Sequence, residues 1–169
     1  DGTLIEDVNY LRKKEEIRLL PGAAEAVRLL NRSGIPAIII TNQSAVARGW
    51  LTEKEVLELQ AEVDARFREA GARFDAVYFC PHHPEIGDPT YRMLCSCRKP
   101  QPGMIRKAAR EWGIDPGRSV MIGDSPSDVE AGFRAGCRSV LVRSKDNSAV
   151  APPAGDADFV ASDILEAIK

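Results

Sequence analysis

Residues 36–44 of the chain read Pro-Ala-Ile-Ile-Ile-Thr-Asn-Gln-Ser. The apolar run from Ala37 to Ile40 is too continuous for a strand with one face in water, so we expect a strand that is buried on both faces. Strands of this kind belong to parallel sheets that helices cover on both sides. The polar residues after the run lie at the carboxyl end of the predicted strand, where open α/β sheets bind their ligands. This stretch therefore predicts both a fold class and the place of a functional site.

Apolar strands alternate with helical patterns along the rest of the chain, which predicts an α/β fold, a Rossmann-like three-layer α/β/α architecture with a mostly parallel sheet. The predicted strands cover residues 36–41, 74–80, 119–123 and 138–142 and a short stretch near Phe159. The predicted helices cover residues 21–33, 52–71, 102–112 and 127–135, and Ser162 caps a last helix. A polar loop around Pro152 precedes the last strand. No repeat or linker divides the sequence, so we expect residues 1–169 to form a single domain.

The composition argues against several classes of function. The 23 basic and 25 acidic residues give a net charge of −2, so no global charge attracts the chain to nucleic acid or to an anionic membrane. No apolar run approaches the roughly 18 residues that a membrane-spanning helix needs, and no secretory signal pattern opens the sequence. We therefore expect a cytoplasmic protein that holds any anionic substrate by local positive charge.

Three of the four cysteines, Cys80, Cys95 and Cys97, fall in one short segment together with His82 and His83. In the cytoplasm, clustered cysteines are more typical of a metal site than of disulfides. One histidine with Cys80, and Cys95 with Cys97, form two short chelating pairs, and Zn²⁺ prefers four such ligands in a closed structural site. The loop between the pairs is rich in Pro, Gly and Asp, so a metal would order it in place of a core. The other interpretation is a surface loop with unrelated thiols.

Further polar motifs stand at the other predicted strand ends and at the start of the sequence. They are Gly123-Asp124-Ser125-Pro126-Ser127-Asp128, Arg98-Lys99 and Asp1-Gly2-Thr3-Leu4. Together with Thr41, they resemble the motifs of the haloacid dehalogenase superfamily of phosphatases. The first motif of that superfamily is a pair of aspartates two positions apart, followed by Gly-Thr. The others are a Thr or Ser after an apolar strand, a Lys, and a Gly-Asp followed by a further acid.

The resemblance implies a Mg²⁺-dependent phosphomonoester hydrolase that works through an aspartyl phosphate. A phosphate dianion repels nucleophiles, so Mg²⁺ and a lysine must neutralise its charge while a carboxylate attacks phosphorus. By resemblance, Asp1 is the general acid/base and a Mg²⁺ ligand through its carbonyl, Asp124 is the other protein ligand, and Asp128 supports them without touching the metal. Thr41 and Lys99 hold the transferring phosphoryl oxygens. Without the resemblance, Asp124 and Asp128 are residues that cap a helix or complement its dipole.

The attacking aspartate of the superfamily stands two positions before the residue that corresponds to Asp1, where this sequence begins. In the superfamily, the strand that leads into this motif is the middle strand of the sheet. Without it, two neighbouring strands would have unpaired edges buried in the core, which is costly. We therefore expect roughly ten further residues upstream, a strand with its lead-in. An inactive chain that binds phosphate without turnover is the alternative.

A narrower resemblance covers nearly the whole chain. Its motifs are Asp7-Val8-Asn9-Tyr10, Thr41-Asn42-Gln43-Ser44, Ala47-Arg48-Gly49, Cys80-Pro81-His82-His83-Pro84 and Cys95-Ser96-Cys97-Arg98-Lys99-Pro100. They look like those of the D-glycero-D-manno-heptose 1,7-bisphosphate 7-phosphatases. The resemblance implies hydrolysis of the C7 phosphate of that sugar, zinc bound by Cys80, His82, Cys95 and Cys97, and a zinc loop (residues 80–97) that acts as a minimal cap. The residues implied to bind substrate are Asp7, Val8, Asn9, Tyr10, Thr41, Asn42, Gln43, Ser44, Arg98 and Lys99. Arg98 is implied to recognise the distal phosphate or the sugar. Arg48 either contacts the substrate or belongs to a plain connector.

Histidinol-phosphate phosphatases share this zinc cluster and are the second interpretation. They join the two chelating pairs by a shorter loop, and the fourteen residues between Cys80 and Cys95 favour the heptose enzymes. A nucleic-acid phosphatase would need a basic stripe or an aromatic stacking platform, which the sequence lacks. The expected partner is therefore a small sugar bisphosphate, with no nucleic acid and no membrane. A monomer is expected, because the zinc loop can close the site without a second subunit.

Overall fold

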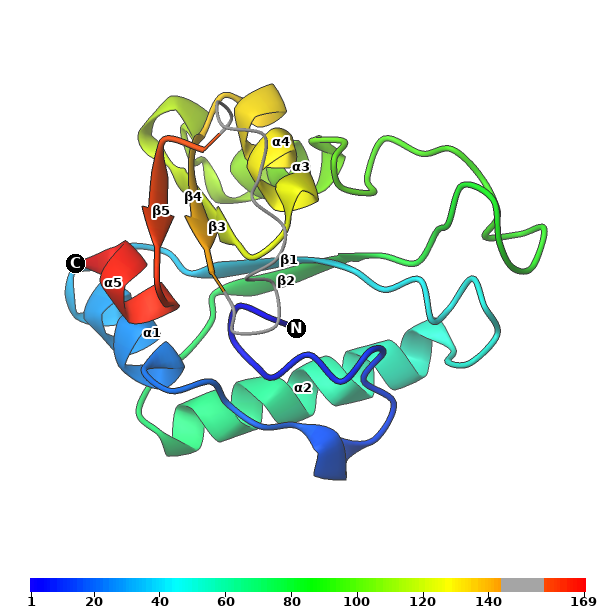
Figure 1. Ribbon diagram of the computed structural model, residues 1–169, viewed down its shortest axis with the longest axis horizontal. Helices are drawn as coiled ribbons and strands as arrows, with labels where there is room; N and C mark the ends of the chain where they lie inside the picture. Colours follow the sequence, from blue (N-terminus) through cyan, green and yellow to red (C-terminus); the bar gives the residue numbers. More distant parts are fainter. Residues whose placement is uncertain (144–156) are drawn as a thin grey trace.

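The computed structural model describes residues 1–143 and 157–169, so the predicted loop around Pro152 lies outside the described residues. Helices and strands alternate from residue 23 to residue 142, as predicted (Figure 1). The strands are β1 (Ile38–Asn42), β2 (Ala76–Cys80), β3 (Val120–Gly123), β4 (Arg138–Val142) and β5 (Phe159–Ala161). The helices are α1 (Ala23–Arg32), α2 (Glu53–Glu69), α3 (Gly103–Trp112), α4 (Pro126–Ala135) and α5 (Ile164–Ile168), with 3₁₀ turns at Lys14–Glu16 and Pro116–Arg118. None of the described helices is long and apolar enough to cross a membrane.

Local sequence signals explain where two of the helices begin and end. The Thr52 hydroxyl accepts a hydrogen bond from the Glu55 N–H, and the Glu55 carboxylate accepts one from the Thr52 N–H, so this pair starts α2 as predicted. Helix α4 starts in the same way at Ser125 and ends at Gly136, whose φ of +90° favours glycine.

The predicted starts of two other helices were wrong. Pro21 precedes α1, and the cap position is Gly22 with a φ of +77°, where the chain passes close to Leu165. The cap of α5 is Asp163 rather than Ser162, because the Asp163 carboxylate accepts the Glu166 N–H at 2.8 Å. A carboxylate gains more than a hydroxyl from the positive end of a helix. Ser162 donates instead to the Glu166 side chain at 2.6 Å.

Every pair of neighbouring strands in the described sheets is parallel, as predicted. The strands form two sheets, β1-β2 and β3-β4-β5. Within residues 1–143 and 157–169, no strand pairs with the remaining edge of β1 or of β3. A cavity of about 210 Å³ lies between these edges and is lined by residues 38–40 and 120–122. The side chains of β1 are accordingly half-buried rather than fully buried as predicted, because one edge of the strand opens onto this cavity.

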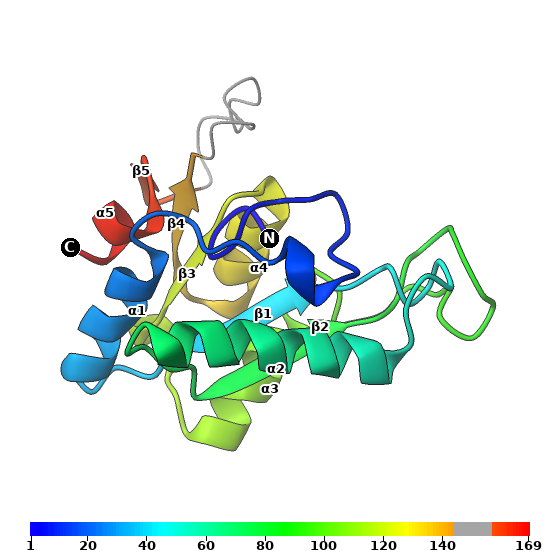
Figure 2. The ribbon, with the colours of Figure 1, turned by 90° about the horizontal axis from the view of Figure 1, so that it is seen from below.

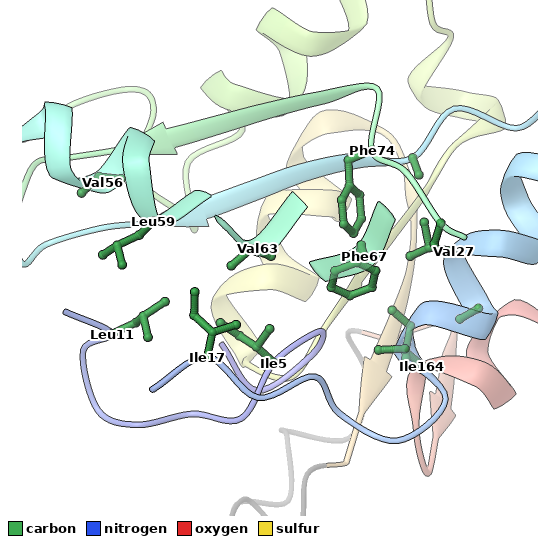
Figure 3. Packing of buried hydrophobic residues seen from close by; sticks show 14 of the residues in the cluster. Ile5, Leu11, Ile17, Val27, Val56, Leu59, Val63, Phe67, Phe74 and Ile164 are labelled. Carbon is green, nitrogen blue, oxygen red and sulfur yellow. The ribbon is translucent and has the colours of Figure 1, made fainter. Parts of the chain in front are cut away.

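Helices lie on both sides of the strands, as the predicted three-layer architecture requires. Figure 1 shows α3 and α4 on one side and α2 on the other. The main core lies against α2, whose Val56, Leu59, Val63 and Phe67 are buried (Figure 3). The N-terminal segment contributes Ile5, Leu11 and Ile17 to the same core. This packing holds residues 5–17 against α2 and so determines where the polar residues of that segment lie (Figures 2 and 3).

Candidate active site

The carboxyl ends of β1 and β3 and the start of the chain meet at the cavity between the two sheets. Its polar lining residues are Asp1, Thr3, Thr41, Gln43, Lys99, Asp124 and Asp128. Parallel pairing explains the convergence, because strands that run in the same direction end at the same edge of a sheet. The structure thus brings together residues that the sequence motifs assigned to one site.

Lys99 is held firmly at this site. Its Nζ donates to the Ile40 carbonyl at 3.0 Å and lies 2.5 Å from the Asp128 carboxylate. Its backbone is held by Asn42, whose Nδ2 donates to the Lys99 carbonyl at 3.1 Å and whose Oδ1 accepts the Lys99 N–H at 3.0 Å. The resemblance implied a substrate contact for Asn42, and in the structure its side-chain amide holds the Lys99 backbone. The Lys99 side chain is 12% exposed, so solvent screens its charge only weakly.

Asp128 connects helix α4 to Lys99. One carboxylate oxygen, Oδ2, accepts hydrogen bonds from the Ser125 N–H at 3.1 Å and from the Ser125 hydroxyl at 2.8 Å. The other oxygen faces Lys99. Gly123 permits this approach, because a Cβ at that position would lie 2.3 Å from the Asp128 Cβ. The sequence left open whether Asp128 caps the helix or supports the site; in the structure its side chain caps α4 and also pairs with Lys99.

Asp124 stands directly after β3 and its carboxylate faces the N-terminal segment. The Thr3 hydroxyl donates to Oδ1 at 2.8 Å, and Gly2, with a φ of +72°, passes so close that a Cβ would lie 2.2 Å from Oδ2. Burial raises the pKa of Asp124; the Thr3 hydrogen bond opposes this, and the nearby Asp128 adds to it. A cation beside such a carboxylate stabilises its charged form, and Mg²⁺ prefers oxygen ligands. The Asp124 carboxylate lines the same cavity as Asp1 and therefore fits the Mg²⁺ that the motifs imply.

Thr41 and Gln43 connect this site to the end of β2. Thr41 lies opposite Phe79 in the parallel pair, and its hydroxyl accepts a hydrogen bond from the Gln43 side chain at 3.1 Å. A hydroxyl that accepts in this way keeps its own hydrogen for a further acceptor. The Gln43 N–H donates to the Cys80 carbonyl at 2.7 Å. This hydrogen bond connects the residue that follows β1 to the first cysteine of the zinc loop.

Cys80, His82, Cys95 and Cys97 converge beside the end of β2, and their ligand atoms all lie within 4.8 Å of one another. The Cys97 Sγ is 3.1 Å from the Cys80 Sγ and 3.4 Å from the His82 Nδ1. His83 has a different role, because its Nδ1 accepts the N–H groups of Glu85 and Ile86 at 3.1 and 3.0 Å. Of the two histidines that the sequence left open, the structure places His82 with the cysteines.

The surroundings of the cluster suit a metal. Burial is the main influence that raises the pKa of Cys80 and of Cys97, so neither thiol ionises readily without a cation. Burial alone would also raise the pKa of Cys95, but hydrogen bonds, including one from the Arg98 N–H at 3.4 Å, lower it. One nitrogen and three sulfur ligands complete a tetrahedron and leave no open position, as in structural Zn²⁺ sites. These four residues therefore fit Zn²⁺.

We expect Cys97→Ser to weaken zinc binding by at least about 10-fold, because serine removes one of the thiolates that Zn²⁺ prefers. Competition with a colorimetric chelator measures the affinity. Cys137→Ser is the matched control, since Cys137 lies between α4 and β4, outside the cluster, and its replacement should leave the affinity unchanged. Equal zinc affinity in wild type and Cys97→Ser would contradict the assignment.

The zinc loop packs against the segment that follows β1. The Asp88 N–H donates to the Ala47 carbonyl at 2.8 Å, and a Cβ on Gly87 would lie 1.8 Å from the same oxygen. Figures 1 and 2 both show the two segments side by side at one end of the molecule. Arg98 belongs to this region, because its Nη1 donates to the His82 carbonyl at 2.9 Å. It lies beside the zinc cluster rather than in the lining of the cavity around Lys99.

Residues 7–10 form a separate loop. The Asp7 carboxylate accepts the Asn9 N–H at 2.8 Å, and Asn9 and Tyr10 have φ angles of +53° and +82°. A tyrosine in this conformation costs roughly 1 kcal/mol or more, which packing must offset. The Tyr10 ring packs edge-on against Trp50 at 4.9 Å between centroids. Asp7, Val8, Asn9 and Tyr10 do not line the cavity around Lys99, nor does Ser44, which is 8% exposed.

Sequence reasoning missed two residues. Thr3 follows the first motif but was given no role, although its hydroxyl holds Asp124. Its position directly after Asp1-Gly2 was the available signal. Trp50 stands one residue beyond the Ala47-Arg48-Gly49 motif and contacts both Tyr10 and Arg48. A tryptophan beside a motif arginine, 45% exposed, could have been noticed as a candidate for cation–π stacking.

A HAD-hydrolase-like family model matches residues 96–167. The D-glycero-beta-D-manno-heptose-1,7-bisphosphate 7-phosphatase of Rhodopseudomonas palustris is 46% identical over 136 residues, which cover 80% of this chain and 76% of that protein. The protein of the same name from Haemophilus influenzae is 36% identical over 169 residues, 99% of this chain and 89% of that protein.

A solved structure agrees with these sequence relatives. The D,D-heptose 1,7-bisphosphate phosphatase from B. bronchiseptica, complexed with magnesium and phosphate, matches with a TM-score of 0.86 at 28% identity. The match covers 99% of this chain and 92% of that one. Motifs, fold and relatives agree, and the chain belongs to the HAD-like phosphatase family of the D-glycero-β-D-manno-heptose-1,7-bisphosphate 7-phosphatases.

Proposed function

We propose that the chain hydrolyses the C7 phosphate of D-glycero-D-manno-heptose 1,7-bisphosphate and leaves the C1 phosphate in place. The observation that carries this proposal is the meeting of Asp1, Thr41, Lys99 and Asp124 at one cavity. Relatives named for this activity, the first of them 46% identical, give the substrate. The solved relative complexed with magnesium and phosphate supports the same chemistry at this site.

The residues have distinct proposed roles. Mg²⁺, held by the Asp124 carboxylate and the Asp1 carbonyl, would supply positive charge to the phosphate and orient it. Lys99 adds a second positive charge, and its pairing with Asp128 keeps the ammonium oriented before substrate binds. The Thr41 hydroxyl donates to a phosphoryl oxygen. The Asp1 carboxyl holds the proton that the departing sugar oxygen takes to become a hydroxyl.

The attacking carboxylate is proposed to lie upstream of Asp1, in a strand that fills the cavity between β1 and β3. The support for this is the pair of facing strand edges, whose N–H and C=O groups need partners. We call the chain with these residues added the extended chain, and we propose that it forms one catalytic domain with the zinc loop as a small cap. We also propose that it acts as a cytoplasmic monomer, without nucleic-acid partners.

Phosphate release by the extended chain tests the function. We expect kcat/KM for heptose 1,7-bisphosphate to exceed that for histidinol phosphate by about 100-fold, because only the sugar carries a second phosphate to recognise. Removing Mg²⁺ with a chelator should abolish turnover, and adding it back should restore turnover. Equal or faster hydrolysis of histidinol phosphate would contradict the proposed substrate, and turnover without Mg²⁺ would contradict the mechanism.

A further inference from the structure

Arg48 lies in a cluster of aromatic rings outside the cavity around Lys99. Its guanidinium lies over the Tyr10 ring and over the Trp50 ring, 5.2 Å from each centroid. The two rings themselves meet edge-on. A guanidinium between two aromatic faces is held flat and loses little freedom on binding a ligand. The cluster therefore holds the guanidinium in a defined position.

Within the part of the chain that the structure describes, the charge of Arg48 has no carboxylate partner. Its Nε is shielded from solvent, and in the part of the chain that the structure describes it has no hydrogen-bond partner. No carboxylate among residues 1–143 and 157–169 forms an ion pair with Arg48. Aromatic faces attract a cation but do not satisfy its N–H groups. A positioned guanidinium without an acceptor is suited to an anion from outside the chain.

Two features connect Arg48 to the proposed active site. The zinc loop holds its segment through the Asp88 to Ala47 hydrogen bond, and Arg48 itself donates its N–H to the Ser44 carbonyl at 3.1 Å. The zinc loop also passes the Arg48 backbone, because a Cβ on Gly87 would lie 3.1 Å from the Arg48 nitrogen. Arg98 directly precedes Lys99 in the chain. The zinc loop therefore contacts the Arg48 segment through Asp88 and the Arg98 guanidinium through the His82 carbonyl, so both arginines lie against the loop that ends beside Lys99.

We infer that Arg48, held between Tyr10 and Trp50, binds the phosphate of the substrate that is not transferred, and so makes the enzyme selective for a bisphosphate. The inference rests on the proposed function. A sugar with a phosphate at each end needs two anion sites, and Lys99 with Asp124 serves only the phosphate that leaves. Arg48 is then a specificity residue for the retained phosphate, and the strained backbone at Tyr10 serves to present one wall of its site.

The test compares two substrates, heptose 1,7-bisphosphate and heptose 7-phosphate, which lacks the retained phosphate. In the extended chain, Arg48→Gln should lower kcat/KM for the bisphosphate by about 10- to 100-fold, mainly through KM. The same variant should change kcat/KM for the 7-phosphate by less than about 3-fold, because that substrate never reaches Arg48. Arg48→Lys keeps the charge but cannot form the bidentate hydrogen bonds of a guanidinium. We expect it to lower kcat/KM by less than Arg48→Gln does, again for the bisphosphate alone.

The matched control is Arg12→Gln. Arg12 also lies over the Trp50 ring, at 5.5 Å, but it is exposed, so its replacement removes the same charge without removing the proposed contact. Equal losses on both substrates in Arg48→Gln and in Arg48→Lys would overturn the inference and leave Arg48 a packing residue. The inference would also be overturned if Arg12→Gln lowered kcat/KM for the bisphosphate alone, and by as much as Arg48→Gln does. The loss of one positive charge would then explain the effect. If the wild-type extended chain hydrolyses neither sugar, the proposed function fails and this inference fails with it.

Discussion

The chain that begins at Asp1 is expected to release phosphate from heptose 1,7-bisphosphate at least about 10⁴-fold more slowly than the extended chain. Thr41, Lys99 and Asp124 can hold and polarise a phosphate, but none of them is placed by the motifs to attack it. The upstream segment would supply the attacking carboxylate. It would also pair with the open edges of β1 and β3, which now border a cavity of about 210 Å³. The rate of phosphate release at saturating Mg²⁺ is measured for both chains.

A third chain separates the two contributions. Replacing the upstream aspartate by asparagine in the extended chain keeps the added strand but removes the nucleophile. We expect this variant to be as stable to urea as the extended chain and as inactive as the chain that begins at Asp1. Comparable turnover by the extended chain and the chain from Asp1 would contradict the proposal, because the attacking group would then have to lie within residues 1–169.

Lys99→Met in the extended chain is expected to lower kcat/KM by about 10³-fold. The methionine fills a similar volume but carries no charge to stabilise the phosphoryl group. It also leaves the Asp128 carboxylate, whose side chain is 6% exposed, without its cation. Breaking a buried ion pair from one side costs about 3 kcal/mol of unfolding free energy. Steady-state kinetics and urea unfolding measure the two losses separately.

The double variant Lys99→Met/Asp128→Asn distinguishes stability from catalysis. Asparagine removes the uncompensated charge and can still accept hydrogen bonds from Ser125, so we expect most of the stability to return. Activity should remain low, because the positive charge is still absent. Lys107→Met on the exposed surface of α3 is the control and should change neither quantity appreciably. Recovery of activity in the double variant would show that Lys99 acts only by supporting the structure.

The elements whose signals are local were predicted well. The capping box at Thr52 and the glycine after α4 depend on hydrogen bonds and φ angles within a few residues, so the sequence contains them in full. The start of α5 was placed wrongly, because Ser162 and Asp163 are both acceptable caps and only their orientation toward Glu166 decides between them. The half-buried side chains of β1 were not predicted, because burial depends on what lies across its open edge.

The amino-acid sequence by itself determined the α/β class, the strand ends that carry the motifs, and the three cysteines of the zinc cluster, because these follow from periodicity and from the chemistry of residue types at short spacing. It could not separate His82 from His83 without the resemblance, since both stand beside Cys80 in the sequence and only the folded loop turns one ring toward the thiols. Tertiary structure alone assigned Asn42 to the Lys99 backbone, Thr3 to Asp124 and Arg48 to the ring of Tyr10. Each of these contacts joins residues that are brought together by packing of separate elements, and nothing in the local sequence specifies that distance.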